Sequence, residues 1–164
     1  MPILLELCRW IYQTPLSVSI RESTWTFPII ESVHTLGIVL VAGTIAIFDL
    51  RLLGLLLKRT PVSQLGRVIL PWTWAGFVVM FLSGGLLFIS ESATNYFNLA
   101  FRLKLLLLVL VGLNPLLFHL TIYKKVDTWD LAEVTPFPAR AAATSSLLLW
   151  TGIIIAGRMI AYLH

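Results

Sequence analysis

The residues best suited to chemistry lie inside an apolar stretch of the chain. Residues Phe27 to Leu53 are long and apolar enough to cross a bilayer, yet they include Glu31, His34 and Asp49. An ionisable side chain at membrane depth is costly, so each one needs a partner, water or a ligand. An imidazole there can bind a metal ion or haem iron, or transfer a proton, while a nearby carboxylate orients the ring. His34 and Glu31 are therefore the first candidates for a site.

Cations from other apolar stretches are expected near His34. Lys104 lies near the start of the third stretch at the same end, and Arg158 and Met159 lie near the end of the fourth. Such cations can hold an anionic group, for example a haem propionate, a quinone oxygen or a carboxylate. If His34 ligates haem iron, Met159 or Met80 is a candidate sixth ligand. Two plainer interpretations remain, in which His34 is a hydrogen-bonded packing residue and Lys104 reaches the lipid headgroups. The predicted cofactor site in the outer half of the bundle consists of Glu31, His34, Lys104, Arg158 and Met159.

Helical geometry predicts two ion pairs between the first and fourth stretches. Glu31 and Asp49 are 18 residues apart, which is five turns, so they lie on one line about 27 Å long. Arg140 and Arg158 have the same spacing. In antiparallel helices the two lines match, which predicts an outer pair of Glu31 with Arg158. It also predicts an inner pair of Asp49 with Arg140.

His119 does not match His34 in depth. The two histidines lie on parallel stretches at depths that differ by roughly 18 Å, so they cannot ligate one haem iron. We expect His119 and Asn114 to belong to an inner polar layer with Asp49. His164 is terminal and expected to be exposed.

The composition is that of a membrane protein. The chain has 164 residues, of which 58% are hydrophobic and only 12% are charged, against about 25% charged in soluble domains. This balance excludes a soluble enzyme. The net charge of +4 lies in short basic clusters beside apolar stretches and requires no nucleic-acid partner. The single cysteine, Cys8, excludes an intramolecular disulfide and a cysteine-rich metal site.

The hydropathy pattern predicts one all-α membrane domain over residues 1–164, a four-helix transmembrane bundle with an N-terminal interfacial amphipathic helix. We expect the interfacial helix at 3–13, and spans at about 27–49, 69–90, 100–122 and 141–163. Basic residues concentrate between the first and second spans and between the third and fourth. The positive-inside rule therefore places both termini outside. A homo-oligomer or a membrane-complex partner is also expected.

Several motifs give the chain a resemblance to a known family. The ordered motifs are Pro15 to Ser17, Ile20 to Ser23, Glu31 to His34, Asp49 to Gly54, Leu70 to Trp72, Phe101 to Lys104 with Asn114, and Gly157 to Tyr162. Together they resemble an uncharacterised family of small bacterial membrane proteins, a domain of unknown function. The resemblance implies a multi-pass protein of the bacterial inner membrane with four spans, and no established activity. The four-helix plan is also similar, at fold level alone, to b-type cytochromes and copper-handling membrane proteins.

Three hypotheses for the function follow. The leading hypothesis is a membrane protein that binds a redox cofactor, haem b or quinone, through His34, with Glu31 orienting the ring. The second is a small transporter of a metal such as copper, or of protons, in which His34 binds the metal. The third is a non-catalytic structural subunit of a membrane complex. No sequence motif identifies a reaction.

Overall fold

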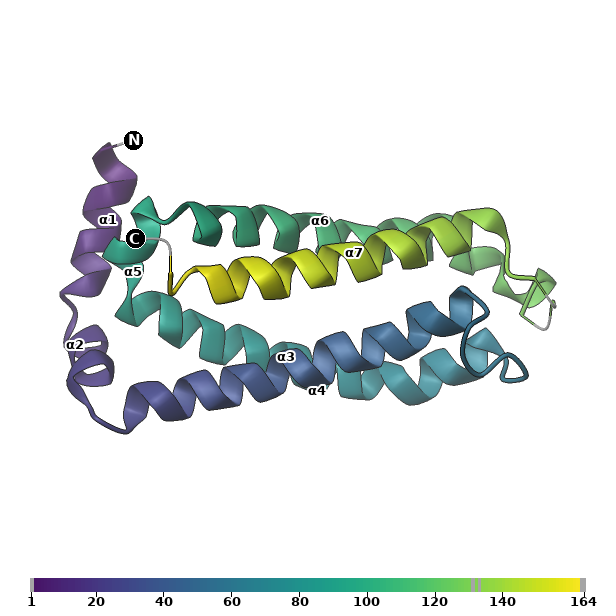
Figure 1. The fold of residues 1–164 in the computed structure, drawn as a ribbon, viewed down its shortest axis with the longest axis horizontal. Helices are drawn as coiled ribbons and strands as arrows, with labels where there is room; N and C mark the ends of the chain where they lie inside the picture. The colour runs from purple at the N-terminus through teal and green to yellow at the C-terminus, as the bar shows by residue number, and fades with distance from the viewer. Residues whose placement is uncertain (1, 131, 133, 163–164) are drawn as a thin grey trace.

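Four long apolar helices make up most of the chain. The computed structural model describes residues 2–130, 132 and 134–162. The long helices are α3 (Thr26–Leu52), α4 (Val62–Ser90), α6 (Leu99–Thr121) and α7 (Phe137–Met159), and no strand occurs among the described residues (Figure 1). Each is long and apolar enough to cross a membrane. The predicted all-α four-helix bundle is confirmed.

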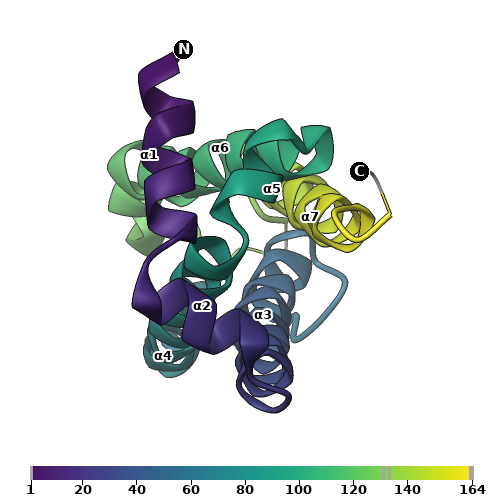
Figure 2. The same cartoon turned by 90° about the vertical axis from the view of Figure 1, so that its left-hand side faces the viewer.

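The four helices form two hairpins. Helix α3 packs along α4, α6 packs along α7, and the hairpins meet through α3 and α7. Figure 1 shows both termini at one end of the bundle and the two loops, residues 53–61 and 122–136, at the other. We call these the terminal end and the loop end. Figure 2, viewed from the terminal end, shows α3 and α4 side by side below α6 and α7.

Two span boundaries differ from those expected. Helix α4 begins at Val62 rather than near residue 69, and α7 covers Phe137–Met159 rather than 141–163. The first turns of α4 contain polar residues, which lowers their hydropathy. Nevertheless Val62 and Leu65 are buried, because they pack at the loop end. Tertiary packing therefore extends the helix beyond its most apolar part.

Short helices cover the terminal end of the bundle. Helix α1 (Pro2–Tyr12) corresponds to the expected interfacial helix, whereas α2 (Pro15–Glu22) and α5 (Ser92–Phe97) were not expected. The 3₁₀ helix η1 (Tyr123–Thr128), also not expected, lies at the loop end instead. Helix α1 crosses the bundle end (Figure 2), and the Ser92 hydroxyl donates to the Cys8 carbonyl at 2.8 Å. The opposite face of α1 exposes Ile3, Leu7 and Trp10. This amphipathic arrangement suits a helix in the bilayer interface.

The N-terminus of α4 is capped from the other hairpin. Its N-cap residue, Pro61, has no side-chain donor or acceptor to offer, but the Asp130 carboxylate accepts from the Ser63 backbone N–H at 2.9 Å and from the Ser63 hydroxyl. Partial burial alone would raise the pKa of Asp130, but these hydrogen bonds and the nearby Arg51 guanidinium outweigh it and lower that pKa. The loop end is therefore tied together by a charge-assisted helix cap.

The C-terminus of α4 is capped from α2. Arg21 Nη1 donates to the Ser90 carbonyl at 3.2 Å, and the Ser17 hydroxyl donates to the Ile89 carbonyl at 3.0 Å. These contacts satisfy carbonyls that lack an intrahelical partner, and they place a cation at the negative end of the helix. Helix α4 is thus held at both ends by side chains distant in sequence.

Helices α3 and α4 approach each other most closely at glycines. A Cβ atom on Gly37 would lie 3.1 Å from the Met80 backbone nitrogen, and one on Gly76 would lie 2.9 Å from Val41 Cγ2. The run of small residues from Ala42 to Thr44 is also typical of a close helix contact, but a Cβ on Gly43 would meet nothing within 4 Å. Gly43 itself lies on an exposed face of α3, whereas its neighbours make the helix contact: Ala42 packs against the core, and the Thr73 hydroxyl of α4 donates to the Thr44 hydroxyl at 2.9 Å.

Candidate functional site

His34 is half-buried on α3 and held from α4 through one ring nitrogen. Its Nδ1 lies 3.1 Å from the Met80 carbonyl oxygen and 3.1 Å from the Ser83 hydroxyl oxygen. The Ser83 hydroxyl donates its own hydrogen to the Val79 carbonyl. Both neighbours of Nδ1 are therefore acceptors, which assigns the proton to Nδ1. In the neutral ring this leaves a lone pair on Nε2, which has no hydrogen-bond partner among the described residues.

Gly84 makes room for the imidazole. A Cβ atom at Gly84 would lie 2.9 Å from His34 Cε1, closer than real Cβ contacts come, whereas one at Gly85 would meet nothing within 4 Å. The small residues Ser83 to Gly85 are typical of a close helix contact, but the sequence does not indicate that the contact is with His34. Which of the two glycines faces His34 depends on the rotation of α4 about its own axis, and hydropathy does not determine that rotation.

Lys104 extends from α6 toward the same region. The Lys104 ammonium interacts electrostatically with His34. Its Nζ atom also lies 3.6 Å from the point where a Cβ of Gly157 on α7 would be. Among the described residues it has no hydrogen-bond acceptor and no carboxylate partner. Within the described chain, then, an imidazole lone pair and an ammonium lie in one half of the bundle without partners, and we call this pair the His34 site.

The remaining residues of the expected cofactor site lie on the outside. Glu31 is exposed and lines a shallow hollow with Ser32 and Thr35. Arg158 is exposed, and its Nη2 donates to the Tyr162 hydroxyl at 3.3 Å. Met159 is 39% exposed. The structure thus places His34 and Lys104 within electrostatic range of each other, and it places the other three residues on the surface.

Asp49 is buried against α7 without a cation. The Ser146 side chain interacts with the Asp49 carboxyl group, and the Oδ2 atom of Asp49 has no hydrogen-bond partner. Within the described part of the chain, the only other buried side-chain atom without a partner is Trp150 Nε1, one turn from Ser146 on α7. We call Asp49, Ser146 and Trp150 the Asp49 site.

Neither ion pair expected from the helical spacing is in contact. Arg140 is exposed at the start of α7, and Arg158 is turned to Tyr162. The expected geometry assumed that α3 and α7 face each other along their whole length. In the structure α3 packs mainly along α4 and shares a smaller contact with α7.

The inner polar residues separate into two environments. Asn114 Nδ2 donates across to α7, to the Ala142 carbonyl and the Ser145 hydroxyl, both at 2.9 Å. His119 is exposed, and its Nδ1 lies 3.1 Å from the Pro115 carbonyl of its own helix. His164 lies outside the described residues. No group of three His, Cys, Asp or Glu side chains that could hold a metal occurs in the described chain.

One family model matches a region of the chain that includes both the His34 site and the Asp49 site. A model described as a family of unknown function, DUF6644, matches residues 24–163. The chain belongs to this family. The matched residues contain all four long helices, so the family is defined by the membrane bundle. No curated protein and no solved structure matches the chain.

Proposed function

We propose that this protein binds a quinone-class redox cofactor at the His34 site. The observation that carries the proposal is the pairing of a lone pair on His34 Nε2 with an unpartnered ammonium on Lys104. Both side chains are partly buried, and ionisable groups at membrane depth are costly without partners, so their retention together favours a ligand that satisfies both. A quinone head group does so, because it presents oxygens that accept from an ammonium and, when reduced, hydroxyls that donate to an imidazole.

The geometry supports a division of roles within the site. The Met80 carbonyl and the Ser83 hydroxyl hold the imidazole with Nδ1 protonated, so Nε2 is the atom that meets the ligand. Lys104 is the donor to a ligand oxygen. Because Gly84 and Gly157 lack side chains, the imidazole and the lysine side chain can pack against α4 and α7 at these positions. A lipid-soluble quinone reaches such a site from the bilayer without crossing water.

The test is binding of a short-chain benzoquinone to the detergent-purified protein, with extraction and quantification of any co-purified quinone. The wild type is expected to bind saturably, and His34→Ala and Lys104→Met are expected to bind at least about tenfold more weakly, the loss of one hydrogen bond to a charged or reacting group. His119→Ala is the matched control, because His119 bonds only within its own helix. Equal binding by His34→Ala and His119→Ala, or no binding by the wild type, contradicts the proposal.

Haem b is a second candidate at the same nitrogen. A ligating histidine commonly donates its other ring N–H to a carbonyl, which is the arrangement of His34 with Met80. Lys104 then holds a propionate. A Soret band in the purified protein that is lost in His34→Ala assigns haem to the site. If neither haem nor quinone is found and His34→Ala only lowers the unfolding temperature, the structural-subunit hypothesis replaces both.

We propose that the loop end faces the cytoplasm of a bacterial inner membrane. Its exposed basic residues, Lys58, Arg59, Arg67, Lys124 and Lys125, support this orientation. Cysteine-accessibility labelling tests it. A cysteine at Lys124 should react only after the inner membrane is permeabilised.

A further inference from the structure

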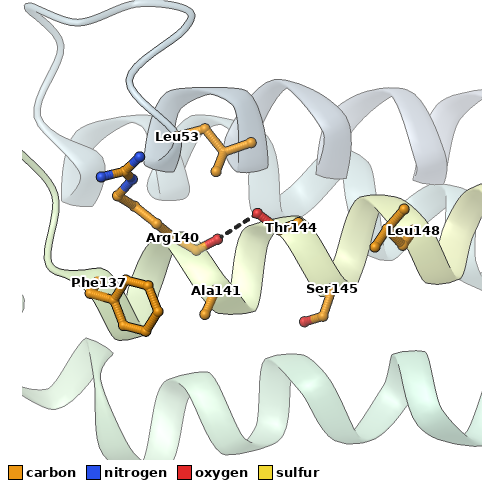
Figure 3. Close-up of a pocket in the computed structure, with 7 residues that line it drawn as sticks. All are labelled: Leu53, Phe137, Arg140, Ala141, Thr144, Ser145 and Leu148. Atoms are coloured by element: carbon orange, nitrogen blue, oxygen red, sulfur yellow. Dashed lines mark hydrogen bonds between the residues drawn. The ribbon is translucent and has the colours of Figure 1, made fainter.

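A hollow at the loop end lies beside Arg140, and none of the residues that line it belongs to the His34 site or the Asp49 site. Its volume is about 490 Å³, within the range of small-molecule sites. It is lined by Leu53, Phe137, Arg140, Ala141, Thr144, Ser145 and Leu148. In Figure 3, Leu53 at the end of α3 points down toward α7, and Arg140 extends beside it toward the loops. The other lining residues follow along α7.

The charged end of this hollow has no protein partner. Arg140 is exposed, and within the described residues its guanidinium forms no hydrogen bond or ion pair. The nearest turn of α7 is its first, where the helix dipole also favours an anion. A guanidinium matches the oxygens of a phosphate group better than a lysine ammonium does.

The rest of the hollow is effectively apolar. The Thr144 hydroxyl donates to the Arg140 carbonyl at 3.0 Å (Figure 3), and the Ser145 hydroxyl donates to the Ala142 carbonyl at 2.9 Å. Both hydroxyls are therefore satisfied and present little polarity to a ligand. From Arg140 to Leu148 the wall runs about 12 Å along α7, from the loop end into the bilayer.

We propose that this hollow binds an anionic phospholipid, with the phosphate at Arg140 and an acyl chain along Ala141, Ser145 and Leu148. The polar and apolar ends occur in the order that a lipid presents at that depth. Exposed lysines and arginines of both loops, including Lys58 and Lys124, raise the local concentration of anionic lipid at this end. This inference does not depend on the proposed quinone site.

Native mass spectrometry of the delipidated protein with added phosphatidylglycerol or phosphatidylcholine tests the proposal. The wild type is expected to retain phosphatidylglycerol in preference to phosphatidylcholine, and Arg140→Gln is expected to lose about tenfold of that preference, the value of a charge-assisted hydrogen bond. Arg67→Gln is the matched control, since Arg67 is an exposed arginine at the same end. Equal preference in Arg140→Gln and Arg67→Gln overturns the proposal.

A second variant tests the apolar part. Ala141→Trp fills the hollow and is expected to reduce retention of both lipids, whereas Thr151→Trp, on an exposed part of α7 outside the hollow, leaves it unchanged. Free glycerol phosphate in excess should not displace the lipid, because it lacks the acyl chain. Displacement by glycerol phosphate contradicts the acyl-chain contact. A dimer that carries no lipid and is lost in Ala141→Trp assigns the hollow to a second copy and overturns the proposal.

Discussion

The His34 site and the Asp49 site lie on the same helix but differ in what surrounds them. At the His34 site two glycines allow the imidazole and the lysine side chain to pack against α4 and α7, and an imidazole nitrogen and an ammonium lack partners in the described chain. At the Asp49 site the aspartate is 5% exposed, and its carboxyl group interacts with the Ser146 side chain of α7. Ionisable residues within a membrane span can therefore have different roles in the same helix. Polar groups without partners that extend from different helices toward one region favour a ligand, whereas a single buried group packed against a neighbouring helix favours a structural role.

The largest effect is expected from a substitution that disturbs the contact between α3 and α4 beside His34. Gly37→Ala is expected to destabilise the protein by about 1–3 kcal/mol, because its Cβ would lie 3.1 Å from Met80 backbone that cannot rotate away. The same backbone holds His34, so quinone binding should fall as well. Thermal unfolding in detergent gives the first result and quinone titration the second.

Gly43→Ala is the matched control on the same helix. A Cβ there meets nothing within 4 Å, and alanine is the better helix former. It should retain both stability and binding. A similar loss of stability in Gly37→Ala and Gly43→Ala would refute the assigned helix contact.

The next variant separates binding from stability. Gly84→Ala places a Cβ 2.9 Å from His34 Cε1, so the ring must turn and its Nε2 must move. We expect quinone binding to weaken by about tenfold or more, with a smaller change in unfolding temperature. Gly85→Ala, which meets open space, should bind as the wild type does. If Gly84→Ala binds quinone as tightly as the wild type does, His34 does not supply the atom that contacts the quinone.

The loop end can be weakened without touching either site. Asp130→Ala removes the cap of α4 and is expected to cost about 1 kcal/mol. Because the folded state lowers the pKa of Asp130, its stabilisation is complete above the unfolded value of about 3.9 and disappears as pH falls through the lower folded value. Unfolding measured against pH should therefore show a smaller acid-dependent loss in Asp130→Ala than in the wild type. Identical pH profiles would contradict the capping role.

The smallest effect is expected at the Asp49 site. Asp49→Asn retains an oxygen that accepts from Ser146 and removes a carboxyl group without a cation. Its stability should stay within about 1 kcal/mol of the wild type, and quinone binding should not change. A loss of quinone binding comparable to that of His34→Ala would erase the distinction between the two sites.

The sequence predicts the bundle and one half of the candidate site. Apolar length and basic loops are sufficient for the four long helices, and depth alone brings His34 and Lys104 to the same half. The rotation of each helix about its axis is not determined by hydropathy. For this reason the sequence does not identify Met80 and Ser83 as the residues that hold the imidazole ring, or Gly84 as the position against which the ring packs. The two expected ion pairs are not in contact for the same reason, because they require α3 to face α7 rather than α4.

The most direct test is ¹⁵N NMR of the histidine side chains in detergent, with and without a short-chain benzoquinone. We predict that His34 is neutral and protonated at Nδ1, and that its Nε2 resonance moves saturably when the quinone is added. His119 should not move, and the change at His34 should be lost in Lys104→Met. A His34 ring protonated at Nε2, or one that does not respond to the quinone, would contradict the account.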